Sequence, residues 1–159
     1  MTPKNSSVQN QQAKSAHPDN KVKIETQGPV QIKSVEQFER YLSDDKPVIV
    51  DFWASWCQPC RLMAPMFDKI AQDFTGEIHF LKINVEEVDA LAAAFKIRSI
   101  PTLLSLHGKE VIDVRVGLVD QAGLAKLAKE ALAYVRGETL TQRIKNLFQG
   151  VKKQTEAVN

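Results

Sequence analysis

The chain has 159 residues, of which 43% are hydrophobic and 25% charged, and its formal net charge at pH 7 is +2. This is enough apolar material for one domain with a hydrophobic core. The charge forms no clustered basic face for nucleic acid, and no apolar run approaches the roughly 18 residues of a membrane span.

Residues 1–28 are rich in Gln, Asn, Ser and Lys, which predicts a disordered polar arm. The arm has no apolar stretch like a signal-peptide core and no Arg, so an export signal and an organelle transit peptide are both disfavoured. We therefore expect a cytoplasmic protein, in which two cysteines seldom form a permanent structural bridge.

Residues 29–136 alternate strand and helix patterns and form the expected domain. Pro29–Lys33 predicts a short strand, and Ser34 with Gln37 predicts a capped helix behind it. The expected core side chains of this helix are Val35, Phe38 and Leu42. The nearly continuous apolar run 47–53 then predicts a central strand covered on both faces.

A second helix is expected from about residue 60 to 74, with Pro65 inside it as the source of a kink. Its expected core side chains are Leu62, Met63, Met66, Phe67, Ile70 and Phe74. The later elements are a strand at 78–84, a short helix at 88–95, a hairpin of 102–106 and 110–116, and a helix from the Asp120 cap to about 134, with Gly137 at its end.

This order of elements predicts an α/β fold in which helical crossovers join the first three strands and an antiparallel hairpin completes the sheet. The following segment, 137–159, predicts an extra amphipathic helix that begins near Thr139. Its apolar stripe consists of Leu140, Ile144, Leu147, Phe148 and Val151. The stripe can pack back on the domain, or dock on a partner or a membrane surface.

Cys57 and Cys60 lie where the central strand passes into the second helix. The positive end of a helix favours the thiolate, which is the nucleophile in disulfide exchange. Two intervening residues let the sulfurs reach bonding distance, and Pro59 fits a helix start. Half a zinc site is the alternative, but there is no third Cys, and the three histidines stand singly at His17, His79 and His107.

Asp51 interrupts the apolar central strand, where burial raises the pKa of a carboxyl group. The spacing leaves open whether its side chain points toward the cysteines, away from them, or into solvent. Lys82 in the neighbouring strand is either its charge partner or a snorkelling edge lysine. Pro101 marks a sharp turn before a strand, and from the residues alone its peptide bond is expected to be trans.

Together these residues closely resemble the thioredoxin family over about residues 29–135. The matching segments are Asp51-Phe52-Trp53-Ala54, Trp56-Cys57-Gln58-Pro59-Cys60-Arg61, Pro65, Lys82, Ile100-Pro101-Thr102 and Val116-Gly117. The resemblance implies a thioredoxin fold, with a central mixed five-stranded sheet flanked by helices. It also implies reduction of protein disulfides, without a bound cofactor or metal.

The resemblance further implies roles for single residues. Cys57 would be the exposed nucleophile, Cys60 the resolving thiol, and the two would form the redox disulfide. Asp51 would be the buried acid–base group, with Lys82 beside it and Pro101 as a cis proline. The implied substrate-binding residues are Trp56, Gln58, Pro59, Ile100, Pro101 and Gly117. Electrons would come from NADPH through a thioredoxin reductase, and the chain would be a monomer that acts on disulfide-containing proteins.

Two other functions stay open. Gln58 stands where typical thioredoxins have Gly, and residues between the cysteines tune the redox potential, so a disulfide oxidase or isomerase is one alternative. Ser99 likewise replaces a Gly common before the Ile-Pro pair. The other alternative is a non-enzymatic docking or chaperone module on the same fold, with the C-terminal stripe as its adhesive surface.

Overall fold

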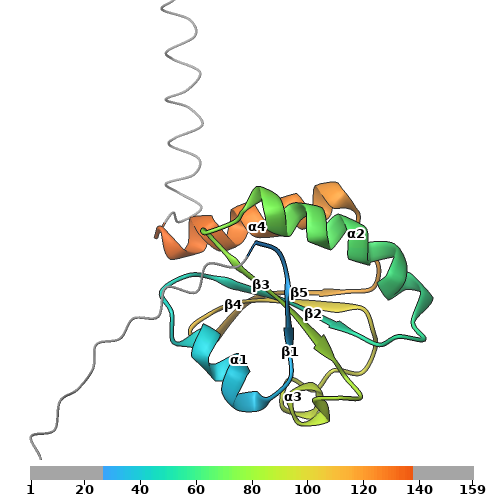
Figure 1. Cartoon of the computed structure of the whole chain (residues 1–159). Coiled ribbons are helices and arrows are strands. Elements are labelled where there is room, and N and C mark those ends of the chain that lie inside the picture. The colour runs from blue at the N-terminus through green and yellow to red at the C-terminus, as the bar shows by residue number, and fades with distance from the viewer. Residues whose placement is uncertain (1–26, 138–159) are drawn as a thin grey trace, which may run out of the picture.

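The computed structural model describes residues 27–137, so nearly all of the expected arm and the expected extra helix lie outside the described residues. The elements follow the expected order (Figure 1). Their bounds are β1 Val30–Ile32, α1 Val35–Leu42, β2 Val48–Trp53, α2 Gln58–Asp73, β3 His79–Asn84, α3 Asp89–Ala94, β4 Thr102–His107, β5 Glu110–Val116 and α4 Gln121–Val135.

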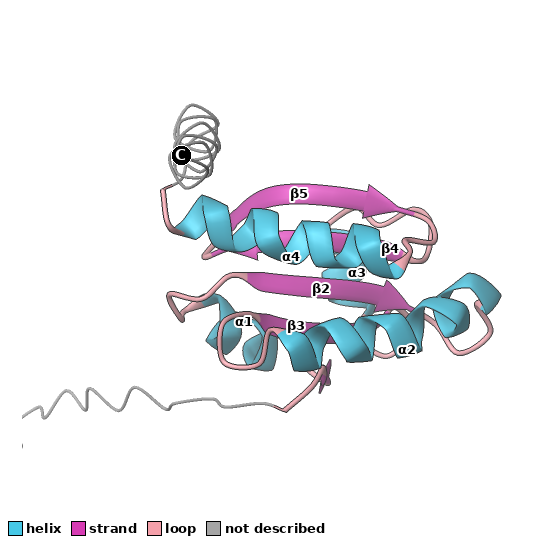
Figure 2. Cartoon of the chain, turned by 90° about the horizontal axis from the view of Figure 1, so that it is seen from above, coloured by secondary structure: helices cyan, strands magenta, loops and turns pink. Residues whose placement is uncertain are grey.

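The five strands form one mixed sheet in the order β1-β3-β2-β4-β5. Strands β1, β3 and β2 are parallel, whereas β4 is antiparallel to both β2 and β5. Helices α2 and α4 lie on one face of the sheet, and α1 and α3 lie on the other (Figures 1 and 2). The sheet expected from the element order, with parallel crossovers and a terminal hairpin, is confirmed.

Alternate residues of β2 face two separate hydrophobic cores. Val48, Val50 and Phe52 pack with α1 and α3, whereas Ile49 packs with α2 and α4. A strand places successive side chains on opposite faces, so an apolar run of this kind belongs to a strand covered on both sides. This alternation fixes the sheet face toward which each remaining side chain of β2 points.

On the helix faces, one expectation is wrong and one buried residue was not expected. Leu62, expected in the core, is 54% exposed. It lies about 100° around the helix from Met63, whose side chain is fully buried, and this turns it outward. Tyr41, not expected in the core, is buried with its ring 5.1 Å from the His79 ring.

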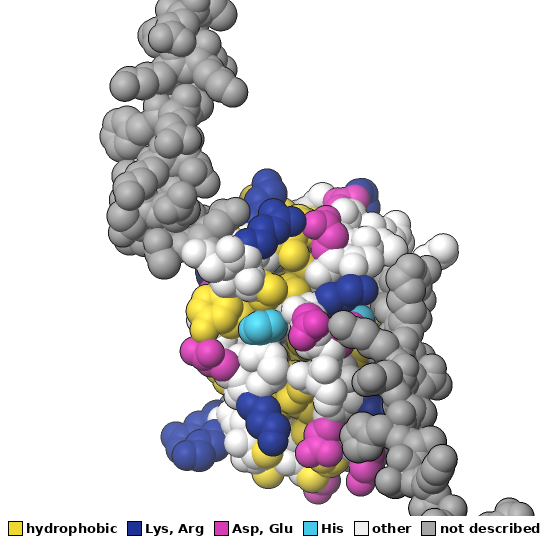
Figure 3. All heavy atoms as spheres, turned by 90° about the vertical axis from the view of Figure 1, so that its left-hand side faces the viewer, with side chains coloured by type: hydrophobic (Ala, Val, Ile, Leu, Met, Phe, Trp, Pro, Cys, Tyr) yellow, Lys and Arg dark blue, Asp and Glu magenta, His cyan; other side chains and the backbone are white. Residues whose placement is uncertain are grey.

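The capping pattern at α1 is largely as expected. The Ser34 hydroxyl accepts a hydrogen bond from the Gln37 backbone N–H at 3.1 Å, while the Gln37 side chain accepts from the backbone N–H of Lys33. At the surface, hydrophobic and charged side chains are interspersed, as the side on which α4 ends shows (Figure 3). None of the helices within residues 27–137 is long and apolar enough to cross a membrane.

Candidate active site

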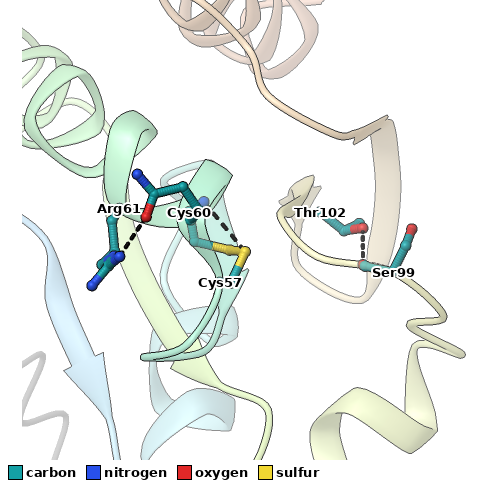
Figure 4. Close-up of a disulfide and its surroundings, with 6 residues drawn as sticks. Cys57, Cys60, Arg61, Ser99 and Thr102 are labelled. Carbon is teal, nitrogen blue, oxygen red and sulfur yellow. Dashed lines mark hydrogen bonds between the residues drawn. A yellow bond between two sulfur atoms is a disulfide. The ribbon is translucent and has the colours of Figure 1, made fainter.

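Cys57 and Cys60 form a disulfide at the N-terminus of α2 (Figure 4), with their Cα atoms 5.3 Å apart. Cys57 is the N-cap of the helix, and its sulfur accepts the backbone N–H of Cys60 at 3.3 Å. Pro59 occupies the first turn, where its missing N–H removes no helical bond. The sulfur pair therefore sits at the positive end of the helix, where a thiolate is stabilised.

Both cysteines are buried in this oxidised state, which corrects the expectation of an exposed Cys57. The residue is 4% exposed, and Cys60 is 2% exposed. Because Cys57 caps the helix, its sulfur is directed onto the first-turn amide and away from solvent. A reagent that attacks this disulfide meets only a narrow sulfur surface.

Asp51 points toward the helix that carries the cysteines. Its neighbours Val50 and Phe52 face α1 and α3, so the alternation of β2 directs Asp51, like Ile49, to the α2 side. The side chain is fully buried, and neither carboxylate oxygen has a hydrogen-bond partner among the described residues. The strand-end, solvent-facing alternative for this residue is wrong.

Burial raises the pKa of the Asp51 carboxyl to about 7. The Lys82 charge lowers this pKa, and the Asp68 carboxylate on α2 raises it, but both effects are smaller than that of burial. A carboxyl group with such a pKa exchanges protons readily at neutral pH. Its position beneath α2 suits it to serve a thiol at the start of that helix.

Lys82 is the register partner of Asp51 in β3 and lies on the same face as Phe80. Its ammonium nitrogen lies over the Trp53 ring, 5.2 Å from the centroid, which is a cation–π geometry. No described residue donates a hydrogen bond to Asp51, so Lys82 acts on it through the electric field and forms no close ion pair with it.

The Ile100–Pro101 peptide bond is cis, so the expectation of a trans bond from the residues alone is wrong, and the one drawn from the family resemblance is met. Tertiary contacts surround this turn. Pro101 is buried, its carbonyl accepts the Gly117 N–H at 2.8 Å, and the Thr102 hydroxyl donates to the Ser99 carbonyl at 2.7 Å. Thr102 pairs with Phe52, which brings this turn to the end of β2 beside the disulfide (Figure 4).

The expected substrate-binding residues lie at the surface around the disulfide to different degrees. Trp56 is 66% exposed, and its indole N–H donates to the Glu86 carboxylate at 2.9 Å. Gln58 and Pro59 are exposed, and the Gln58 side-chain oxygen accepts a hydrogen bond from Arg61 (Figure 4).

The other members of the expected surface come from the opposite side of the sulfur pair. Ile100 is half-buried and packs on the core, and Gly117 adopts a φ of +92°. Sequence reasoning missed two exposed apolar neighbours of Gly117, namely Val116 and Leu118. It also missed Glu86, because a single glutamate after a strand carries no recognisable signal.

The histidines weighed as zinc ligands have other surroundings. His79 Nε2 lies 2.8 Å from an Asp44 carboxylate oxygen, and His107 Nε2 lies 3.2 Å from the Asp45 carbonyl. His17 lies outside the described residues. Within residues 27–137, no three His, Cys, Asp or Glu side chains come together as a metal site requires.

Known proteins are similar to the chain in both sequence and fold. The thioredoxin family model matches residues 29–130. Thioredoxin 1 of Nostoc sp. is 43% identical over 94 residues, which cover 59% of this chain and 88% of the relative. Thioredoxin of Haemophilus influenzae is 38% identical over 89 residues, which cover 56% and 83%.

Solved structures support the same assignment. A mutant thioredoxin from Halobacterium salinarum superimposes with a TM-score of 0.62 at 31% identity, and the match covers 67% of this chain and 92% of the other. Chloroplastic thioredoxin z gives a TM-score of 0.59 at 29% identity, with coverages of 67% and 96%. Together with a cysteine pair joined at a helix N-terminus, these matches identify the chain as a protein-disulfide oxidoreductase that belongs to the thioredoxin family.

Proposed function

We propose that the chain reduces disulfides in other proteins, with Cys57 as the nucleophile and Cys60 as the resolving thiol. One arrangement carries the proposal: the cysteine pair caps α2 while the buried Asp51 faces the same helix from the sheet. The capping position favours the thiolate on Cys57, and Asp51 supplies a proton acceptor near neutral pH.

The reaction has two exchange steps. The Cys57 thiolate attacks one sulfur of the substrate disulfide, which forms a mixed disulfide and releases the other substrate sulfur as a thiolate. Cys60 then loses its proton to Asp51 and attacks the Cys57 sulfur. The second substrate thiolate leaves, and the Cys57–Cys60 disulfide remains, so two electrons have passed from the chain to the substrate.

The surface around the sulfurs suits varied protein substrates. Trp56, Val116 and Leu118 expose apolar side chains, and the turn at Pro101 is held to Gly117 by a backbone hydrogen bond. Such a surface binds a polypeptide by shape and main chain more than by side-chain identity. Asp51 lies below it and accepts the Cys60 proton, while the Lys82 charge lowers the pKa of Asp51.

The cycle closes when the disulfide is reduced again. We propose that the electrons come from NADPH through a thioredoxin reductase in the cytoplasm and that the chain works as a monomer. The membership of the thioredoxin family supports this proposal. The measurement is reduction of the purified chain by NADPH with a thioredoxin reductase, followed as loss of NADPH absorbance. If a competent reductase gives no turnover, this part of the proposal is contradicted.

Insulin reduction tests the central step. Cys57→Ser should abolish it, whereas Cys60→Ser should accumulate a mixed disulfide with insulin through Cys57. Unchanged insulin reduction by Cys57→Ser would overturn the proposal, and partners retained by the double cysteine variant would favour a docking module. Equilibration of the Cys57–Cys60 pair with glutathione buffers decides the direction, because a strongly oxidising potential would favour an oxidase or isomerase.

A further inference from the structure

The Trp53 side chain lies at the end of β2, on the same face of the sheet as Asp51. The two residues are two positions apart in the strand, so both side chains point to the α2 side. Trp53 is half-buried, and its indole N–H is buried with no hydrogen-bond partner among the described residues. Its ring face, by contrast, meets the Lys82 ammonium, 5.2 Å from the centroid. The polar contact of this side chain is therefore made by the ring and not by the N–H.

The Lys82 ammonium has two partners within reach. Lys82 is the register partner of Asp51 in β3, and the next residue of β2 on the same face is Trp53. Adjacent strands lie about 4.8 Å apart, and the flexible stem of a lysine is long enough to reach either side chain. In the structure the ammonium lies over the ring, and neither carboxylate oxygen of Asp51 has a hydrogen-bond partner among the described residues. The ammonium thus contacts the ring in preference to the carboxylate.

The other groups around Asp51 do not account for this preference. Among the described residues, the charged groups whose fields act on its carboxyl are Lys82 and Asp68 on α2. The register partner of Asp51 in β4 is the apolar Leu103, and the two cysteines at the start of α2 are joined as a disulfide and do not titrate. A carboxylate attracts an ammonium, so the contact with the Trp53 ring is what opposes a close ion pair with Asp51.

We propose that Trp53 is a positioning residue that holds the Lys82 ammonium over its ring and thereby keeps it from pairing closely with Asp51. The inference rests on the proposed function, in which Asp51 accepts the Cys60 proton. Because the interaction of two charges weakens with distance, an ammonium over the ring lowers the pKa of Asp51 less than one on the carboxylate would. Trp53 therefore acts on the proton through Lys82 and is itself neither donor nor acceptor of it.

The test is a titration of Asp51 in the full-length oxidised chain, in Trp53→Leu, in Lys82→Met and in the variant with both changes. The carboxyl-carbon NMR signal of Asp51 reports its pKa, and the oxidised state keeps both cysteines out of the titration. In Trp53→Leu the ammonium is free to approach Asp51, so the pKa should fall from about 7 by at least about one unit, a tenfold loss of proton affinity. In the Lys82→Met background the same change should have little effect, because no ammonium remains to move.

Two results overturn the proposal. One is an unchanged or raised pKa of Asp51 in Trp53→Leu. The other is an equal fall in both backgrounds, because the ring would then act by excluding water and not through Lys82. Urea unfolding checks that each variant is folded. Trp53→Phe keeps a ring that attracts a cation more weakly, so it should give a smaller fall in pKa, and it replaces the leucine variant if that variant does not fold.

Mixed-disulfide resolution separates this inference from the proposed function. If Asp51 is the proton acceptor, the pH inflection of the resolving step in Trp53→Leu should move to lower pH by as much as the pKa of Asp51 falls. A pKa that falls while the inflection stays in place contradicts the role of Asp51 in the reaction and still supports the placement of Lys82 by Trp53. The titration itself needs no turnover.

Discussion

Asp51 and Lys82 stand opposite each other in adjacent parallel strands, yet the Lys82 ammonium lies over the Trp53 ring, 5.2 Å from its centroid, and not on the Asp51 carboxylate. The carboxylate thus keeps no close counter-ion or hydrogen-bond donor among the described residues. Burial therefore raises its pKa to about 7, and the Lys82 charge lowers this pKa by less than burial raises it. A close ion pair would instead have held the group ionised and ended its use as a proton carrier.

Asp51→Asn should slow the resolving step by about a hundredfold, a typical loss when a general base is removed. The reason is that the amide cannot accept the Cys60 proton. The pH dependence of this step should also lose its inflection near pH 7. Rapid-mixing measurement of mixed-disulfide resolution from pH 5.5 to 8.5 (a range of about 1.5 units either side of that pKa) checks this. Alkylation of Cys57 is the control, and an unchanged pH profile would contradict the role of Asp51.

The same carboxyl should make stability depend on pH. Its pKa rises on folding from 3.8 to about 7, so the folded state holds the proton more tightly and loses stability as pH rises through this window. Three pKa units correspond to about 4 kcal/mol. The free energy of unfolding of Asp51→Ala, relative to that of wild type, should therefore increase by about this much between acid and mildly alkaline pH. Urea unfolding of the oxidised chain measures this difference. Asp73→Ala at the surface is the control, and a pH-independent difference would refute the assignment.

The fold was predictable because its signals are local and agree with one another. The apolar run of β2, the Ser34 and Asp120 caps, and the hairpin around Gly108 each specify an element from a few adjacent residues. The outward turn of Leu62 was not predictable in this way. A leucine beside a helix stripe faces the core or the solvent according to the packing of other elements.

The site was predictable in its members but not in its contacts. A helix start is predicted by the spacing of Cys57, Pro59 and Cys60 alone. The direction of Asp51 required the alternation of β2 relative to two cores, and the placement of Lys82 over Trp53 required the neighbouring strand. Contacts between residues distant in sequence leave no pattern in one chain read alone, and the Trp56–Glu86 bond is such a contact.

Glu86→Ala should weaken binding of protein substrates. The variant removes the acceptor of the Trp56 indole N–H and frees a side chain that is two-thirds exposed beside the disulfide. A net hydrogen-bond contribution near 1 kcal/mol predicts about a fivefold rise in KM for insulin with little change in kcat. Glu87→Ala is the matched control, because Glu87 pairs with Lys33 instead. Equal effects of both variants would exclude a specific role for the indole contact.

Gly117→Ala should affect both stability and substrate binding. Gly117 has a φ of +92°, which an L side chain rarely adopts, and a Cβ there would meet no atom within 4 Å. The expected loss is therefore backbone strain of about 1–2 kcal/mol. Gly76→Ala is the control because Gly76 has a φ of +82° and similar open space. Chemical unfolding should show similar losses of stability for the two variants. KM for insulin should rise only for Gly117→Ala, because the Gly117 N–H holds the Pro101 carbonyl.

Asp44→Ala should destabilise the chain without changing its chemistry. His79 is 2% exposed, and its Nε2 lies 2.8 Å from the Asp44 carboxylate, so the variant leaves a buried ring nitrogen without its partner. Such a loss costs about 1–3 kcal/mol. Burial opposes the effect, but the hydrogen bonds from His79 and the Asp45 backbone lower the pKa of Asp44.

A lowered carboxyl pKa stabilises the fold above the ordinary value of 3.8 and loses that contribution as pH falls through the folded value. The destabilisation by Asp44→Ala should therefore be full at pH 7 and shrink in acid, as urea unfolding at several pH values would measure. Asp73→Ala breaks only the exposed pair with Lys69 and should cost little. If the two variants lose the same stability at neutral pH, the buried His79 nitrogen does not depend on Asp44. Insulin reduction should be unchanged in both variants, because this end of the sheet serves the fold and not the disulfide.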